Sequence, residues 1–99
     1  MSKKSKPYDP AEFLDTDEVL AEYITEAFAT EDAAEIAHAI GVAARARKMA
    51  QIADDTGLSR ESLYRALSED GNPQLDTIVR VLSALGLQLR AEPCDPVDA

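Results

Sequence analysis

The sequence predicts a small all-α domain with five or six short helices and one short strand near the C-terminus. With 99 residues, the chain has the length of a single small domain. Its composition, 45% hydrophobic and 29% charged, is typical of a soluble, folded protein. Apolar residues recur every three or four positions in several stretches, which glycine, proline or helix-capping residues separate. This pattern favours short amphipathic helices around one core.

The sequence also indicates a cytoplasmic protein. No apolar run approaches the roughly 20 residues that a membrane-spanning helix needs. The basic start, Lys3, Lys4 and Lys6, is followed by PYDPAEF and not by the apolar segment of a secretory signal. The single cysteine, Cys94, has no second cysteine with which to form an internal disulfide. We therefore expect a cytoplasmic location and no membrane partner.

The negative charge is concentrated at the two ends of the chain. The formal net charge is -9. Residues 1–44 hold three lysines and ten acidic residues, residues 45–90 hold seven basic and six acidic residues, and residues 91–99 add three acidic residues. This asymmetry indicates two surfaces with different partners.

Residues 1–30 form the first predicted unit, an acidic helical segment. Asp9 is a predicted N-cap of a short helix with Pro10 at its first position, and Asp15 or Thr16 begins a second helix. An apolar stripe on the second helix consists of Val19, Leu20, Tyr23, Ile24, Ala27 and Phe28. Another face carries Glu18, Glu22 and Glu26. The segment is therefore amphipathic and strongly anionic on its outside.

Residues 31–93 form the second predicted unit, and its first helix covers about 31–47. Thr30 is the predicted N-cap. The predicted buried face consists of Ala33, Ile36, Ala37, Ile40 and Ala44. Gly41 within this helix costs up to about 1 kcal/mol relative to alanine, so we expect a close helix contact there.

The remaining elements of residues 31–93 are shorter. The stretch MAQIADDTG predicts a helix that stops at Gly57, and Ser59 caps the next one. Asn72 and Pro73 are predicted to begin a last helix, whose apolar face consists of Leu75, Ile78, Val79, Leu82 and Leu85. Residues 87–92 alternate apolar and polar, which predicts a strand that pairs with another copy or another protein, or does not form. Residues 94–99 are an acidic tail.

The middle of the chain contains the pattern of a helix-turn-helix. Ala53 is small where the second helix crosses the first, and Gly57, four residues later, tolerates the positive φ of the turn. Leu58 fills the angle between the helices, Ser59 caps the second helix, and Leu63 anchors it to the core. The sequence therefore predicts a recognition helix at 59–67.

The outer face of this recognition helix is suited to DNA. With Leu63 and Leu67 inward, Arg60 and Arg65 face outward and can pair with guanine. Lys48, with Arg45 and Arg47 nearby, can hold phosphate. The complete predicted DNA-binding set is Lys48, Gln51, Ser59, Arg60, Glu61, Ser62, Tyr64 and Arg65. The alternative is that these arginines are ordinary solvated charges.

Two stretches carry a resemblance to a known family, KPYDPAEFLDTDEVLAEYITEAF and AARARKMAQIADDTGLSRESLYRALSEDGNPQLDTIVRVLSALGLQLRAEP. Across residues 6–93, the chain resembles the HigA-like helix-turn-helix antitoxins, the addiction-module antidotes of bacterial type II toxin–antitoxin pairs. The most specific part is GLSRESLYRALSEDGNP. The resemblance implies a cytoplasmic antitoxin that neutralises a small RelE/ParE-superfamily toxin and, as a homodimer, represses its own operon through operator DNA.

The sequence departs from the pattern of many such repressors at one position. Four residues before the small alanine, they have a glutamine that contacts phosphate, whereas this chain has Met49. The phosphate contact therefore shifts to Lys48 or Gln51, or is weaker. Dimerisation is assigned either to the strand 87–92 or to helix 74–85.

The acidic N-terminal helix has two interpretations. Glu18, Glu22 and Glu26 either face a small basic toxin, where charge complementarity speeds encounter, or form a solvated surface that aids solubility.

The sequence does not predict an enzyme, a cofactor or a metal site. His38 is the only histidine, and a structural role is favoured because no nucleophile and orienting acid are paired with it. One cysteine and one histidine, far apart, do not make a zinc site, and no glycine-rich phosphate loop is present. Two alternatives to an antitoxin stay open: a stand-alone helix-turn-helix regulator, and a helical interaction module that does not bind DNA.

Overall fold

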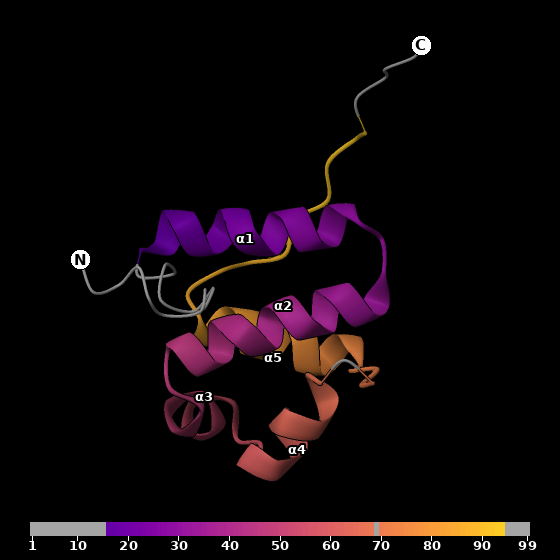
Figure 1. Ribbon diagram of the computed structural model, residues 1–99. Coiled ribbons are helices and arrows are strands. Elements are labelled where there is room, and N and C mark those ends of the chain that lie inside the picture. Colours follow the sequence, from indigo (N-terminus) through magenta and orange to yellow (C-terminus); the bar gives the residue numbers. More distant parts are fainter. Residues whose placement is uncertain (1–15, 69, 95–99) are drawn as a thin grey trace, which may run out of the picture.

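The computed structural model describes residues 16–68 and 70–94, and the regular secondary structure of these residues is entirely helical. The helices are α1 (Asp17–Ala29), α2 (Ala33–Ala46), α3 (Met49–Thr56), α4 (Arg60–Ala66) and α5 (Leu75–Ala84). Helices α1 and α2 lie side by side, α5 lies behind α2, and α3 and α4 occupy the end opposite α1 (Figure 1). The prediction of an all-α domain is confirmed for this part of the chain. The helix predicted after Asp9 lies outside the described residues, as does most of the acidic tail.

The predicted strand at 87–92 is wrong for the single chain. Residues 87–94 form neither helix nor strand. The physical reason is that a strand needs a neighbour for its backbone N–H and C=O groups, and the described ranges contain no other strand.

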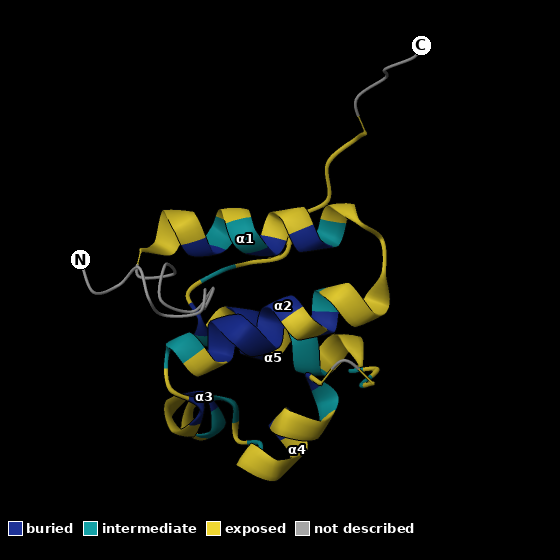
Figure 2. Cartoon of the chain, viewed as in Figure 1, coloured by how far each residue is buried: buried dark blue, intermediate teal, exposed yellow. Residues whose placement is uncertain are grey.

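The core lies between α1, α2 and α5 and continues into α3 and α4. Its largest fully buried side chains are Leu20, Ile40, Val42, Ile52, Leu63, Val81 and Leu85. Figure 2 shows α2 as the most deeply buried helix. Each fully buried side chain of this size contributes about 1.5–3 kcal/mol, so every helix is held by its apolar stripe.

Small residues allow close packing around α2. A Cβ added at Gly41 would lie 2.7 Å from the carbonyl oxygen of Leu67, the residue that follows α4. The predicted close contact at Gly41 is confirmed. Glycine is required at this position because α4 ends directly against the backbone of α2.

Two helix starts differ from the prediction. Thr30 caps no helix start; it follows α1, and its hydroxyl donates to the Ala27 carbonyl at 2.7 Å. Asp32 is the N-cap of α2 and accepts from the Ala34 N–H at 2.9 Å. The turn at Glu31, with a φ of 57°, delays the helix by two residues.

Helix α5 begins after Asn72 and Pro73, at Leu75 with Gln74 as the N-cap. Gln74 has an extended backbone, so residues 72 and 73 cannot belong to the helix.

The predicted apolar face of α5 is only partly buried. Leu82 and Leu85 lie in the core, whereas Leu75 is 67% and Val79 47% exposed. Similarly, Ala33 of the predicted α2 face is exposed. These side chains lie where the described residues provide no covering helix.

None of the helices in residues 16–68 and 70–94 combines the length and the apolar character needed to cross a membrane.

Candidate nucleic-acid interface

Helices α3 and α4 are joined by a tight turn of residues 57–59. Gly57 has φ 79° and ψ 10°, and its N–H donates to the Ala53 carbonyl at 2.9 Å. An L-residue rarely adopts this left-handed backbone, which explains why glycine stands here. The predicted glycine hinge between two helices is confirmed.

Thr56 closes the turn from the α3 side. Its hydroxyl donates to the Ile52 carbonyl at 2.8 Å and accepts from the Leu58 N–H at 3.2 Å. One side chain thus links the last turn of α3 to the backbone after the hinge. Sequence analysis missed this role. A threonine directly before the hinge glycine was the available signal.

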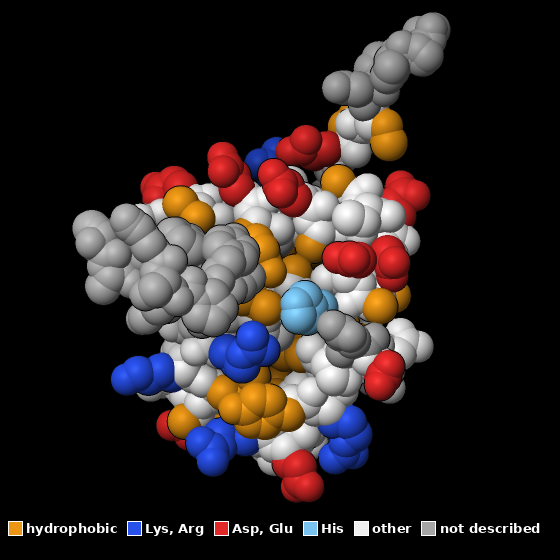
Figure 3. Space-filling view, viewed as in Figure 1, with side chains coloured by type: hydrophobic (Ala, Val, Ile, Leu, Met, Phe, Trp, Pro, Cys, Tyr) orange, Lys and Arg blue, Asp and Glu red, His pale blue; other side chains and the backbone are white. Residues whose placement is uncertain are grey.

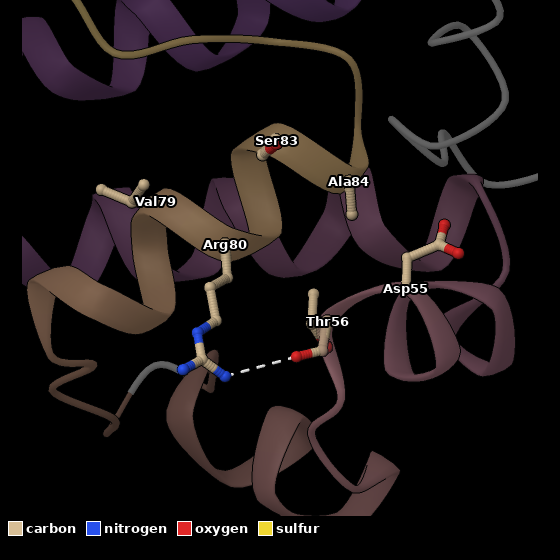
Figure 4. A pocket seen from close by; sticks show the side chains of 6 residues that line it. All are labelled: Asp55, Thr56, Val79, Arg80, Ser83 and Ala84. Atoms are coloured by element: carbon tan, nitrogen blue, oxygen red, sulfur yellow. Dashed lines mark hydrogen bonds between the residues drawn. The ribbon is translucent and has the colours of Figure 1, made fainter.

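Arg80 of α5 holds the same turn from the other side. Its Nη1 donates to the Thr56 carbonyl at 3.3 Å (Figure 4). Its Nε lies 3.4 Å from Oδ2 of Asp76. The cation therefore lies at the C-terminal end of α3, where the helix dipole favours positive charge. No local pattern predicts this contact, because Arg80 and Thr56 are 24 residues apart.

The inner side of α4 is fixed by a cap and by apolar anchors. The Ser59 Oγ accepts from the Ser62 N–H at 3.0 Å, which confirms the predicted N-cap. Leu63 is only 1% exposed, and Leu67 is also buried. Because one side of this short helix is held at both ends, its opposite side has a defined direction.

The opposite side of α4 carries the predicted base-reading residues, all of which are exposed: Arg60, Glu61, Tyr64 and Arg65. Ser62 is also exposed, and its Oγ accepts from the Ser59 hydroxyl at 2.9 Å. The two serines therefore maintain the helix start, whereas the arginines, the glutamate and the tyrosine form the outward surface.

The predicted phosphate contacts differ in what they bind within the chain. Lys48 is exposed between α2 and α3. Gln51 is exposed, but its Nε2 donates to Oδ1 of Asp55 at 3.0 Å. Arg47 pairs with Asp17 of α1 at 2.8 Å, and Met49 lies in the core. Of this group, Arg45, Lys48 and Gln51 are exposed.

Charged side chains are unevenly distributed over the face shown in Figure 3. Most Asp and Glu side chains lie over α1 and the start of α2, whereas Lys and Arg side chains predominate around α3 and α4, where some acidic side chains are also present. The predicted toxin-facing residues, Glu18, Glu22 and Glu26, are all exposed on α1. The two predicted sites therefore lie at different ends of one small domain.

The other polar surfaces are shallow. A hollow between α3 and α5 is lined by Asp55, Thr56, Val79, Arg80, Ser83 and Ala84. A second hollow is lined by Asp32, Ala34, Glu35, His38 and Asp70, and His38 is exposed there. Among residues 16–68 and 70–94, no three His, Cys, Asp or Glu side chains gather as metal ligands would.

Comparison with known proteins gives the family. Residues 4–93 match the family model described as "Probable addiction module antidote protein". An "Uncharacterized protein" of Haemophilus influenzae (strain ATCC 51907 / DSM 11121 / KW20 / Rd) is 42% identical over 92 residues, which cover 93% of this chain and 95% of that protein. No solved structure matches the chain. This chain, with its glycine-hinged helix pair, belongs to the family of probable addiction module antidote proteins.

Proposed function

We propose that the chain is the antitoxin of a type II toxin–antitoxin module. It acts in the cytoplasm as a binding protein without enzymatic activity. It neutralises a small basic toxin of the RelE/ParE superfamily and, as a homodimer, represses its own operon by binding operator DNA. The observation that carries the DNA-binding part is the outward position of Arg60 and Arg65 on a helix fixed by a glycine hinge and a serine cap.

In this proposal α4 enters the major groove of the operator. Arg60, in the first turn, and Arg65, near the end, donate to guanine, and Glu61 accepts from cytosine. Tyr64, Ser59 and Ser62 contact phosphates or base edges. Lys48 supplies the main phosphate contact, because the Gln51 amide already donates to Asp55.

The toxin binds at the other end of the domain. Glu18, Glu22 and Glu26 project from successive turns of α1 and oppose the positive charge of the toxin. Because α1 and α4 lie at opposite ends, one antitoxin can hold toxin and DNA together (Figure 3). A bound basic toxin also cancels part of the net charge of -9, which otherwise repels DNA.

The DNA-binding part is tested by gel retardation with the DNA upstream of the chain's own gene. Arg60→Ala and Arg65→Ala should each weaken specific binding by about 1–3 kcal/mol and leave thermal unfolding unchanged. Arg90→Ala is a matched control, because Arg90 is an exposed arginine outside the five helices. Equal binding by all three variants would contradict the role of α4.

The toxin-binding part is tested with the small basic protein encoded by the adjacent gene. Co-purification of the two full chains is the expected result. Specific DNA binding without toxin binding would identify a stand-alone regulator. Toxin binding without salt-sensitive DNA binding would identify an interaction module instead.

A further inference from the structure

The outward side of α4 carries one acidic side chain between its two arginines. Glu61 lies in the first turn of α4 next to Arg60, and Arg65 follows one turn later. Glu61 and Leu63 are two residues apart, so they point to nearly opposite sides of the helix. Because Leu63 points into the core, Glu61 and Arg65 point away from it. The carboxylate therefore lies within the surface that meets DNA in the proposed function.

The fold does not depend on this carboxylate for a contact. In a capping box the acidic side chain is the third residue of the helix, a position that Ser62 occupies here. The Ser59 cap accepts from the Ser62 N–H without it. Arg65 is suitably spaced to pair with Glu61, yet no ion pair in the described residues includes Glu61. What remains is its attraction to the positive end of a short helix.

A carboxylate at this place opposes DNA binding in general. It cancels one of the two positive charges that Arg60 and Arg65 supply, in a chain whose net charge is already -9. Phosphates repel it, and its burial against a base edge is costly unless a donor faces it. In the major groove guanine presents N7 and O6 and thymine O4, all acceptors, whereas cytosine N4 and adenine N6 are donors. Only cytosine and adenine can therefore compensate the burial of Glu61.

We propose that Glu61 determines operator specificity by exclusion. It lowers the affinity of α4 for DNA in general and admits only a base with an exocyclic amino group at one position of each half-site. Cytosine is preferred there, because adenine places its N7 acceptor beside the amino group. The guanine paired with that cytosine offers two acceptors to Arg65, which lies on the same side of α4. The inference rests on the proposed function, since it requires α4 to enter the major groove.

The test compares base preferences of the full-length chain. Fluorescence anisotropy measures the dissociation constants for DNA from upstream of the chain's own gene, for its single-base variants and for scrambled DNA. For the wild type, guanine or thymine in place of the contacted cytosine should weaken binding about 10- to 100-fold. Glu61→Gln should shift the preference at that position to adenine, since a glutamine amide pairs with both N6 and N7. Glu61→Ala should lose the preference there and bind scrambled DNA more tightly, because the repulsion is removed.

A base analogue tests the amino group itself. Pyrimidin-2-one in place of the contacted cytosine lacks the exocyclic amino group, and it should weaken binding by the wild type more than binding by Glu61→Ala. Glu35→Gln is the matched control, because Glu35 is an exposed glutamate in the first turn of α2. This control should keep the base preferences of the wild type.

The outcomes separate this inference from the proposed function. A Glu61→Ala variant with the base preferences of the wild type would overturn the inference, and a lower melting temperature in that case would assign Glu61 to the stability of α4. The proposed function would stand, because Arg60 and Arg65 can still read the operator. A wild-type chain that does not distinguish the upstream DNA from scrambled DNA would contradict both.

Discussion

Helices α1 and α4 both pack an apolar side on the same core, but their outer sides and their supports differ. Helix α1 has 13 residues, exposes a row of glutamates and packs mainly on α2. Helix α4 has seven residues and is held by a glycine hinge, a serine cap and the close contact between Gly41 and Leu67.

This difference matches what each proposed partner requires. Attraction between opposite charges acts over about 10 Å in ordinary salt and tolerates small displacements. Hydrogen bonds to base edges require donors within a few tenths of an ångström of one position. We therefore expect the α4 end to depend on the exact position of its side chains, and the α1 end to depend on the negative charge that α1 itself carries.

The largest expected effect comes from removing an anchor of α4. Leu63→Ala should lower the free energy of unfolding by about 2–5 kcal/mol. The reason is that the Leu63 side chain is only 1% exposed, so its removal leaves a cavity in the core. Urea unfolding monitored by circular dichroism measures this loss. Leu20→Ala, at the equally buried position of α1, is the control. It should be as destabilising but leave operator specificity unchanged in the folded protein.

The second effect tests the acidic end by charge alone. Changing Glu18, Glu22 and Glu26 together to lysine should slow association with the toxin about tenfold or more and leave unfolding nearly unchanged. Stopped-flow association at low salt measures the rate. The control changes three exposed acids elsewhere, Asp54, Asp70 and Glu92, to lysine. If both triple variants slow association equally, only net charge matters and α1 is a solvated face.

The features of α4 that were predictable from the sequence are those with local causes. The Gly57 hinge, the Ser59 cap and the buried Leu63 follow from residues within one or two turns of each other. The contact of Arg80 with the Thr56 carbonyl joins residues far apart in the chain. It depends on how α5 crosses α3, which no spacing rule specifies.

Errors arose where burial depends on a neighbouring element. Leu75 and Val79 belong to the apolar stripe of α5, yet both are exposed. Such a stripe predicts which side chains share one face of a helix, but not which neighbouring element covers each of them. The alternation at 87–92 is a strand pattern without a second strand in the described residues. In both cases the missing information is tertiary.

The third effect isolates the backbone geometry of the hinge. Gly57→Ala should destabilise the fold by about 1–2 kcal/mol, because an L-residue at φ 79° is strained. Nothing lies within 4 Å of the added Cβ, so no clash contributes. Gly57→Asn should lose less, since asparagine tolerates this region better. Thermal unfolding compares the two variants, and equal losses would indicate a cause other than φ.

The smallest effect concerns the ion pair that joins the two ends. Asp17 is 72% and Arg47 32% exposed, so Asp17→Asn should lower the unfolding free energy by less than about 1 kcal/mol. The released guanidinium lies one residue before Lys48 and becomes available to phosphate. Operator binding at low salt should therefore tighten slightly, and its salt dependence should steepen. Weaker DNA binding would instead mean that the pair positions α3, and the two ends would then be coupled structurally as well as by charge.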